Sequence, residues 1–141
     1  MGWLADTGIW IEVERGRISA ADIHAITGAA AVYLSPVNVA ELQFGVGRMT
    51  NAARRLRAQT MLRRLQRKPL LRIDAATGQV FGRLAAELEA QGRGAEFRVQ
   101  DIWLAAQAVQ RGFALLTTNA KDFVDVPGLK VVALPVAPAG G

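Results

Sequence analysis

The most informative stretch of the sequence is residues 99–117, which read VQDIWLAAQAVQRGFALLT. The pattern predicts a helix over 99–111 that ends at Gly112, a residue typical of helix C-termini. The apolar run 113–117 then predicts a buried strand. Because one tight turn joins the helix to the strand, a strand parallel to its neighbours requires the helix to begin at the carboxyl edge of the sheet. Asp101, near the start of the helix, is therefore expected at that edge.

The rest of the chain also alternates short apolar strands with helices. Further strands are expected at 3–7, 31–34, 70–73 and 129–134. Further helices are expected at 9–14, 20–26, 52–66, from Pro36 to about Gly45 or Gly47, and from the cap Asp74 to about Ala90. Ser35 followed by Pro36 is a strong helix start. We expect an α/β fold with a central parallel sheet of about five strands and helices on both faces.

The length predicts one domain over residues 1–134 and a flexible tail over 135–141. No apolar run approaches the length of a membrane span, and the first residues lack the basic start of a signal peptide. There is no cysteine, which excludes disulfides, thiolate metal sites and a cysteine nucleophile. These features predict a cytoplasmic protein that does not interact with membranes.

Four acidic residues stand in apolar surroundings, where an unpartnered charge is costly. They are Asp6, Glu41, Asp101 and Asp122. In a parallel sheet all four would gather at the carboxyl edge, where α/β proteins bind ligands. Taken singly, each acid also fits an unrelated ion pair or a helix cap.

A shared carboxylate pocket predicts a cation, because like charges this close oppose one another's ionisation. Ligands that are all oxygen favour Mg²⁺ or Mn²⁺, and such an ion can activate water for attack on a phosphodiester. The only histidine, His24, lies far from these acids, which argues against a histidine-based site. Thr118 and Asn119 follow a strand and are candidates to orient a ligand or water, although turns favour both residue types.

A basic segment makes RNA a candidate partner. Residues 48–68 contain eight basic residues and no acid, within a chain whose net charge is +5. The candidate RNA contacts are Arg54, Arg55, Arg57, Arg63 and Arg64. A solvated helix face explains them equally well. The apolar residues Leu56, Met61, Leu62 and Leu65 are expected to form either core or a groove for a partner helix.

Several motifs in this order resemble a known family. They are Leu4-Ala5-Asp6-Thr7, Val39-Ala40-Glu41-Leu42, Phe44-Gly45-Val46, Gln100-Asp101-Ile102-Trp103-Leu104-Ala105-Ala106, Leu116-Thr117-Thr118-Asn119-Ala120-Lys121-Asp122-Phe123 and Val126-Pro127-Gly128-Leu129. Together they span almost the whole chain and resemble the PIN-domain ribonucleases, specifically the toxins of VapBC-type toxin–antitoxin pairs.

The resemblance implies a PIN-like fold and a Mg²⁺- or Mn²⁺-dependent endoribonuclease that acts on single-stranded or structured RNA. It implies that Asp6, Glu41, Asp101 and Asp122 are the catalytic metal ligands, with Thr7, Thr118 and Asn119 in support. It also implies a homodimer and a cognate VapB-like antitoxin. Gly8 departs from the Asn or Ser common in the family, and Gln100 from Asn. We expect these departures to affect catalytic rate and not the fold.

Three other functions fit parts of the pattern. A PIN fold with weak activity could serve only as an RNA- or protein-binding module, and Gly8 supports that alternative. A receiver domain for phosphotransfer would need a second acid near Asp6 and a late lysine outside a strand, whereas Lys130 lies in a predicted strand. A haloacid-dehalogenase-type phosphatase would need an aspartate at position 8.

Overall fold

A computed structural model describes residues 1–94 and 98–136 of the chain. Its sheet has four parallel strands in the order β2-β1-β3-β4, which confirms the predicted parallel α/β fold. The strands are β1 (Trp3–Ala5), β2 (Val32–Tyr33), β3 (Ala114–Thr117) and β4 (Lys130–Ala133). The helices are α1 (Thr7–Glu14), α2 (Ala20–Thr27), α3 (Pro36–Arg48), α4 (Ala52–Leu65), α5 (Ala75–Ala90) and α6 (Val99–Arg111), with a 3₁₀ turn η2 (Ala120–Asp122). Of the expected tail, residues 137–141 lie outside the described residues.

The stretch that joins α6 to β3 has the predicted structure. Gly112 adopts the left-handed conformation with φ of 68°, which lets the chain turn directly from the helix into the strand. β3 is buried along its whole length and pairs with both β1 and β4. The N-terminus of α6 therefore lies at the carboxyl edge of the sheet.

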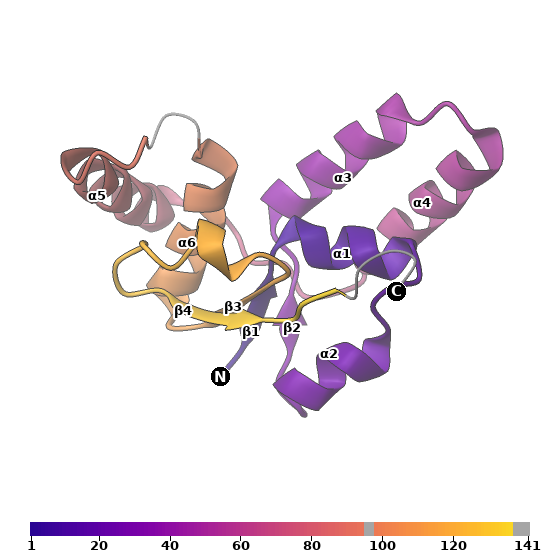
Figure 1. Cartoon of the computed structure of the whole chain (residues 1–141), viewed down its shortest axis with the longest axis horizontal. Coiled ribbons are helices and arrows are strands. Elements are labelled where there is room, and N and C mark those ends of the chain that lie inside the picture. Colours follow the sequence, from indigo (N-terminus) through magenta and orange to yellow (C-terminus); the bar gives the residue numbers. More distant parts are fainter. Residues whose placement is uncertain (95–97, 137–141) are drawn as a thin grey trace.

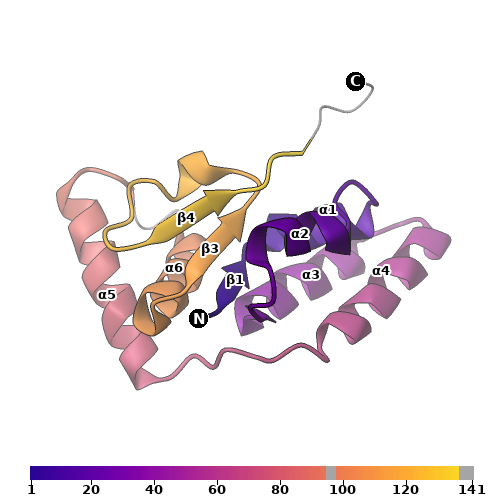
Figure 2. The same ribbon diagram turned by 90° about the horizontal axis from the view of Figure 1, so that it is seen from below.

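Both faces of the sheet are covered because successive strand residues point in opposite directions. Leu4 and Leu115 pack with residues of α6, whereas Ala5 and Leu116 pack with residues of α1, α2 and α4. Burial on both faces explains why these strands read as continuous apolar runs. Figure 1 shows the sheet with α5 and α6 on one side and α1, α2 and α4 on the other. Figure 2 shows α5 beside α6 and α3 beside α4.

Three helices begin at polar caps, and two of these caps, Ser35 and Asp74, were expected from the sequence. Ser35, Asp74 and Ser19 each accept a backbone hydrogen bond from the first turn of α3, α5 and α2, with a reciprocal side-chain bond that completes a capping box. α1 begins two residues earlier than expected, at Thr7, so that β1 ends at Ala5. Among the described residues no helix is long and apolar enough to cross a membrane.

The expected strand 70–73 was wrong, because only a single bridge forms there, between Leu34 and Leu70. The amide of Leu34 donates to the carbonyl of Pro69 at 2.9 Å, and the amide of Leu71 donates to the carbonyl of Leu34 at 2.8 Å. The next hydrogen bond is made by a side chain: Nε2 of Gln107 donates to the carbonyl of Leu71 at 2.8 Å. The carbonyl of Leu71 thus bonds to a buried glutamine of α6, whereas in a longer strand it would bond to the neighbouring strand.

Candidate active site

The four acids come from four segments that meet at the carboxyl edge of the sheet. Asp6 directly follows β1, and Glu41 lies in the second turn of α3. Asp101 lies in the first turn of α6, and Asp122 ends η2, just beyond β3. The placement agrees with the expectation from sequence, whereas their role as metal ligands stays a prediction.

Asp6 is held by the strand beside it. Its amide donates to the carbonyl of Leu116 at 2.8 Å, and its Oδ2 accepts a hydrogen bond of 3.0 Å from the hydroxyl of Thr117. Burial raises the pKa of Asp6, the hydrogen bonds from Thr117 and Thr7 offset part of that rise, and the charge of Asp122 adds to it. The carboxylate is therefore fixed in direction but costly to ionise.

Glu41 is oriented by a buried chain of polar groups. The hydroxyl of Thr7 donates to Oε1 of Glu41 at 2.7 Å and accepts from Nδ2 of Asn38 at 2.9 Å. Asn38 is fully buried, and it also donates to the carbonyl of Ala5 and accepts from the amide of Ser35. Burial raises the pKa of Glu41, the bond from Thr7 opposes that rise, and the charge of Asp6 adds to it. One asparagine thereby links β1, α1 and the start of α3.

Asp101 shows most clearly that the acids act on one another. Its pKa is raised to about 6, first by burial and then by the charges of Asp6 and Asp122, with Glu41 adding a smaller effect. The positive charge of Arg98 offsets part of this rise. Repulsion among all four acids indicates that they share one site that favours a cation.

Asp122 and its neighbours occupy the loop after β3. Oδ2 of Asp122 accepts from Nδ2 of Asn119 at 2.9 Å, and the amide of Asn119 donates to the hydroxyl of Thr117 at 3.0 Å. The hydroxyl of Thr117 thus connects Asp6 to Asn119. A methyl group at Gly8 would lie 3.0 Å from Oγ1 of Thr118, so the missing side chain leaves room that the threonine hydroxyl uses.

Two polar residues of this site were missed by sequence reasoning. Asn38 stands three residues after the cap Ser35, where a capping box predicts a polar side chain, and this was the available signal. Thr117 ends an apolar strand, and nothing in the sequence distinguishes it from an ordinary strand threonine.

The donor set fits a hard, hydrated cation. Within residues 1–94 and 98–136, no three acidic or histidine side chains converge into a preformed metal cage. Mg²⁺ does not require one, because it keeps several waters and is commonly held by only one or two carboxylates. Carboxylates whose ionisation is disfavoured without a positive charge are suited to such an ion.

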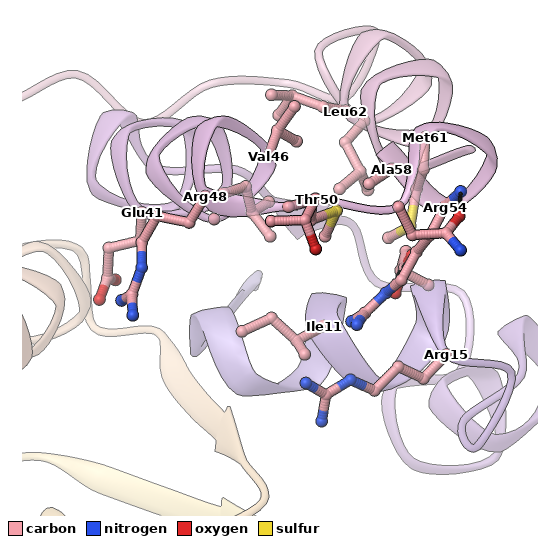
Figure 3. A pocket seen from close by; sticks show the side chains of 16 residues that line it. Ile11, Arg15, Glu41, Val46, Arg48, Thr50, Arg54, Ala58, Met61 and Leu62 are labelled. Carbon is pink, nitrogen blue, oxygen red and sulfur yellow. Dashed lines mark hydrogen bonds and ion pairs between the residues drawn. The ribbon is translucent and has the colours of Figure 1, made fainter. Parts of the chain in front are cut away.

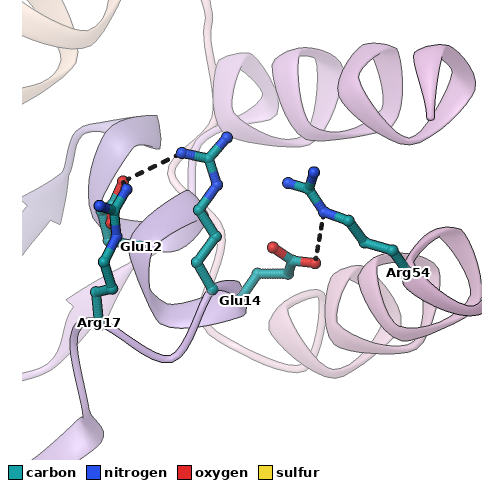
Figure 4. A network of polar contacts seen from close by, with 5 residues as sticks. Glu12, Glu14, Arg17 and Arg54 are labelled. Atoms are coloured by element: carbon teal, nitrogen blue, oxygen red, sulfur yellow. Dashed lines mark hydrogen bonds and ion pairs between the residues drawn. The ribbon is translucent and has the colours of Figure 1, made fainter. Parts of the chain in front are cut away.

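The basic segment is divided between two environments. Arg55, Arg57, Arg63 and Arg64 are exposed on α4. Arg54 instead reaches Glu14 on α1 at 3.8 Å, as Figure 4 shows.

The apolar residues of α4 do not form one surface. Leu62 and Leu65 are buried in the core and Met61 is half-buried, whereas Leu56 is 66% exposed on another side of the helix. The expectation that these side chains form core or a groove is therefore confirmed for Met61, Leu62 and Leu65 and was wrong for Leu56. In α1, Ile9 and Trp10 are likewise buried in the core.

A groove of about 460 Å³ lies between α1, α3 and α4. Apolar side chains line its floor, among them Ile11, Val46, Met61 and Leu62, and Arg15, Arg48 and Arg54 stand around it. Figure 3 shows Glu41 at one end of the groove. The groove therefore leads to one of the four acids.

Residues 4–129 match the family model of the PIN domain. The chain belongs to the PIN-domain family. Ribonuclease VapC1 of Rickettsia felis is 30% identical to it over 135 residues, which cover 95% of this chain and 97% of that protein. Ribonuclease VapC4 of Mycobacterium tuberculosis is 31% identical over 136 residues, which cover 93% and 95% of the two chains.

Solved structures share the PIN fold. The crystal structure of VapBC2 from Rickettsia felis bound to a DNA fragment from its promoter superposes with a TM-score of 0.81 at 23% identity, covering 95% of this chain and 99% of that one. VapBC-1 from nontypeable Haemophilus influenzae superposes with a TM-score of 0.76 at 25% identity, covering 94% and 98%. Membership of the PIN-domain family over most of the chain decides against the receiver-domain and phosphatase alternatives.

Proposed function

We propose that this chain is a divalent-metal-dependent endoribonuclease, the toxin of a VapBC-type pair. The observation that carries the proposal is that Asp101, at the carboxyl edge of a PIN fold, lies close enough to the other three acids for the charge of each to raise its pKa. The names of its ribonuclease relatives support the same activity.

Asp6, Glu41, Asp101 and Asp122 would hold Mg²⁺ or Mn²⁺. A bound ion of this kind supplies an activated water and neutralises charge on the phosphodiester. The chain's other residues keep the carboxylates in place: Thr117 directs Asp6, Thr7 directs Glu41, and Asn119 directs Asp122. Thr118, whose hydroxyl lies beside Gly8, is the remaining residue to which we assign a supporting role.

Cleavage of RNA tests the proposal directly. Purified protein should release fragments from single-stranded RNA in Mg²⁺ or Mn²⁺, lose this activity in EDTA, and regain it poorly in Ca²⁺. Asp6→Asn should lower the rate by orders of magnitude while circular dichroism shows an intact fold. Cleavage that persists in EDTA would exclude the metal-dependent mechanism.

A PIN-fold module that binds RNA or protein without cleaving it is the second candidate, and Gly8 is the observation that favours it. Tight RNA binding by the wild-type chain, with no acid-soluble fragments in either Mg²⁺ or Mn²⁺, would establish that alternative.

We also propose that a VapB-like antitoxin occupies the groove between α1, α3 and α4. An amphipathic helix fits its apolar floor, and the surrounding arginines would attract acidic residues of the partner. A basic side chain at the Glu41 end would pair with the carboxylates in place of the metal.

The chain is further proposed to form a homodimer. The resemblance of its motifs to VapBC-type toxins implies this assembly, and two large apolar side chains, Phe44 and Leu56, are 64% and 66% exposed on α3 and α4. Exposed apolar side chains of this size are common at interfaces.

A further inference from the structure

One arginine joins the two segments that carry Asp101 and Asp122. Nη1 of Arg98 donates to Oδ2 of Asp125 at 2.7 Å, and Nη2 donates to Oδ1 of the same carboxylate at 3.1 Å. Nη2 also donates to the backbone carbonyl of Asp122. Arg98 is the N-cap residue of α6, so these bonds connect the start of that helix to the loop after β3.

The pair is better placed than a surface ion pair. The side chains of Arg98 and Asp125 are only 18% and 14% exposed, and their contact is bidentate. Charge-assisted bidentate bonds of this type are strong and fix direction, whereas exposed pairs contribute little. The hydrogen bonds from Arg98 accordingly hold the pKa of Asp125 below its usual range.

The loop after β3, which Arg98 contacts, makes few other polar contacts near Asp122. Phe123 is fully buried and Val126 is 5% exposed, and these two side chains fix the loop to the core. The side chain of Asp122 is exposed and accepts its hydrogen bond from Asn119, within the same loop. The bonds from Arg98 therefore set the position of Asp122 relative to α6.

We propose that Arg98, held by Asp125, is a positioning residue that sets the separation of Asp101 and Asp122 for metal binding. Asp101 lies three residues beyond Arg98, in the first turn of the helix that Arg98 caps. The side chain of Arg98 thus connects the two segments that carry these carboxylates. This inference rests on the proposed metal-dependent function.

Positioning and simple electrostatics predict opposite results when Arg98 is replaced. The charge of Arg98 acts on both Asp101 and Asp122. If this charge were its only influence, Arg98→Gln would make the site more negative and tighten the binding of a cation. If Arg98 positions the carboxylates, the same substitution weakens the binding, by about 10- to 100-fold as for other residues that orient metal ligands.

Mn²⁺ binding to the metal-free full-length protein distinguishes the two, measured by electron paramagnetic resonance and titration calorimetry. We expect weaker binding in Arg98→Gln and in Asp125→Asn, and an intermediate loss in Arg98→Lys, which keeps the charge but not the bidentate geometry. Arg93→Gln is the matched control, because Arg93 is an exposed arginine whose charge also acts on Asp125. It should bind Mn²⁺ as well as the wild type or slightly better.

Amide hydrogen exchange tests the positioning without any metal. The amide of Val126 donates to the carbonyl of Phe123 at 3.1 Å, and that of Phe123 to the carbonyl of Ala120 at 3.0 Å. Both amides should exchange faster in Arg98→Gln and at the wild-type rate in Arg93→Gln.

The inference is overturned if Arg98→Gln binds Mn²⁺ as tightly as the wild type or more tightly, or if these exchange rates do not change. A wild-type chain that binds no Mn²⁺ would instead overturn the proposed function together with the inference, so the two failures are distinguishable.

Discussion

Asp101 ties the stability of the metal-free protein to pH. Its pKa in the fold, about 6, is above the ordinary value of 3.8. The protonated form therefore stabilises the fold fully below pH ~4, and this contribution is lost as the pH rises through about 6. Above that pH the ionised carboxylate destabilises the metal-free chain.

Asp101→Asn should consequently raise the melting temperature in EDTA at pH 8. Solvent screens a half-exposed carboxylate, so we expect a gain of about 1 kcal/mol, or roughly 3 °C. The gain should vanish at pH 4, and Glu89→Gln, at an exposed acid of α5, should change little. A lower melting temperature of Asp101→Asn at pH 8 would mean that Asp101 has a structural role.

Thr7 allows the alignment of Glu41 to be tested with a small change. Thr7→Val keeps the side-chain shape but removes the hydroxyl that joins Asn38 to Glu41. We expect a loss of about 1–3 kcal/mol in the free energy of unfolding, since the amide of Asn38 loses an acceptor in a buried place. The rate of RNA cleavage should fall by about tenfold.

Thr7→Ser retains the hydroxyl and serves as the control, with near wild-type cleavage. Equal cleavage rates in Thr7→Val and Thr7→Ser, measured at saturating Mg²⁺, would show that the hydroxyl does not align Glu41.

Among single residues, the sequence identified the charged groups and the neutral Thr7 and Asn119, but it missed two other neutral residues. Asp6 and Asp101 are conspicuous because an acid in an apolar run is costly to bury unless a partner compensates its charge. Asn38 and Thr117 are neutral, and a buried amide or hydroxyl needs only a hydrogen-bond partner, which any fold can supply. Their partners come from other segments, so only the three-dimensional arrangement identifies them.

Among the elements, α4 carries the prediction about RNA. Arg55, Arg57 and Arg64 are exposed, so replacing all three with Ala should reduce the dependence of RNA affinity on salt. Each lost phosphate contact lowers the slope of log K against log salt by about 0.7, which gives a total of roughly 2. Binding is measured by fluorescence anisotropy over a range of KCl concentrations.

A matched triple variant controls for the change in net charge. Arg72, Arg83 and Arg111 are exposed arginines elsewhere on the molecule, and replacing them with Ala should leave the slope nearly unchanged. An equal reduction in both variants would mean that RNA responds to total charge and not to α4.

Helices were predicted better than strands, for a physical reason. α6 begins and ends at the expected residues because its amphipathic pattern and Gly112 are local. A strand depends on a neighbouring strand that is distant in sequence. Residues 70–73 form only one bridge to such a neighbour, because the carbonyl of Leu71 accepts a hydrogen bond from the side chain of Gln107 instead. In α4 the helix spacing itself held the information: Leu56 lies about 180° around the helix from Leu65. Leu56 is accordingly exposed, whereas Leu62 and Leu65 are buried.

For the whole molecule we predict a homodimer whose activity an antitoxin blocks in competition with metal. Light scattering at micromolar concentration should give about twice the chain mass of 15.1 kDa. Inhibition of RNA cleavage should weaken as Mg²⁺ is raised, because the antitoxin's basic side chain and the metal would need the same carboxylates. Inhibition that is equal at all Mg²⁺ concentrations would indicate a blocked RNA path instead, and a monomer would refute the dimer.

The pairing of β1 with β3 has a consequence for the synthesis of the protein. β1 is made first, yet one of its strand partners and the hydroxyl that directs Asp6 lie near the other end of the chain, with Thr117 111 positions away. A nascent chain that has not yet produced β3 lacks both a central strand of the sheet and Asp122. Ribosomes that stall or terminate early on this message therefore release fragments that lack one of the four acids. The proposed ribonuclease activity would therefore begin only after residues 114–122 have been translated.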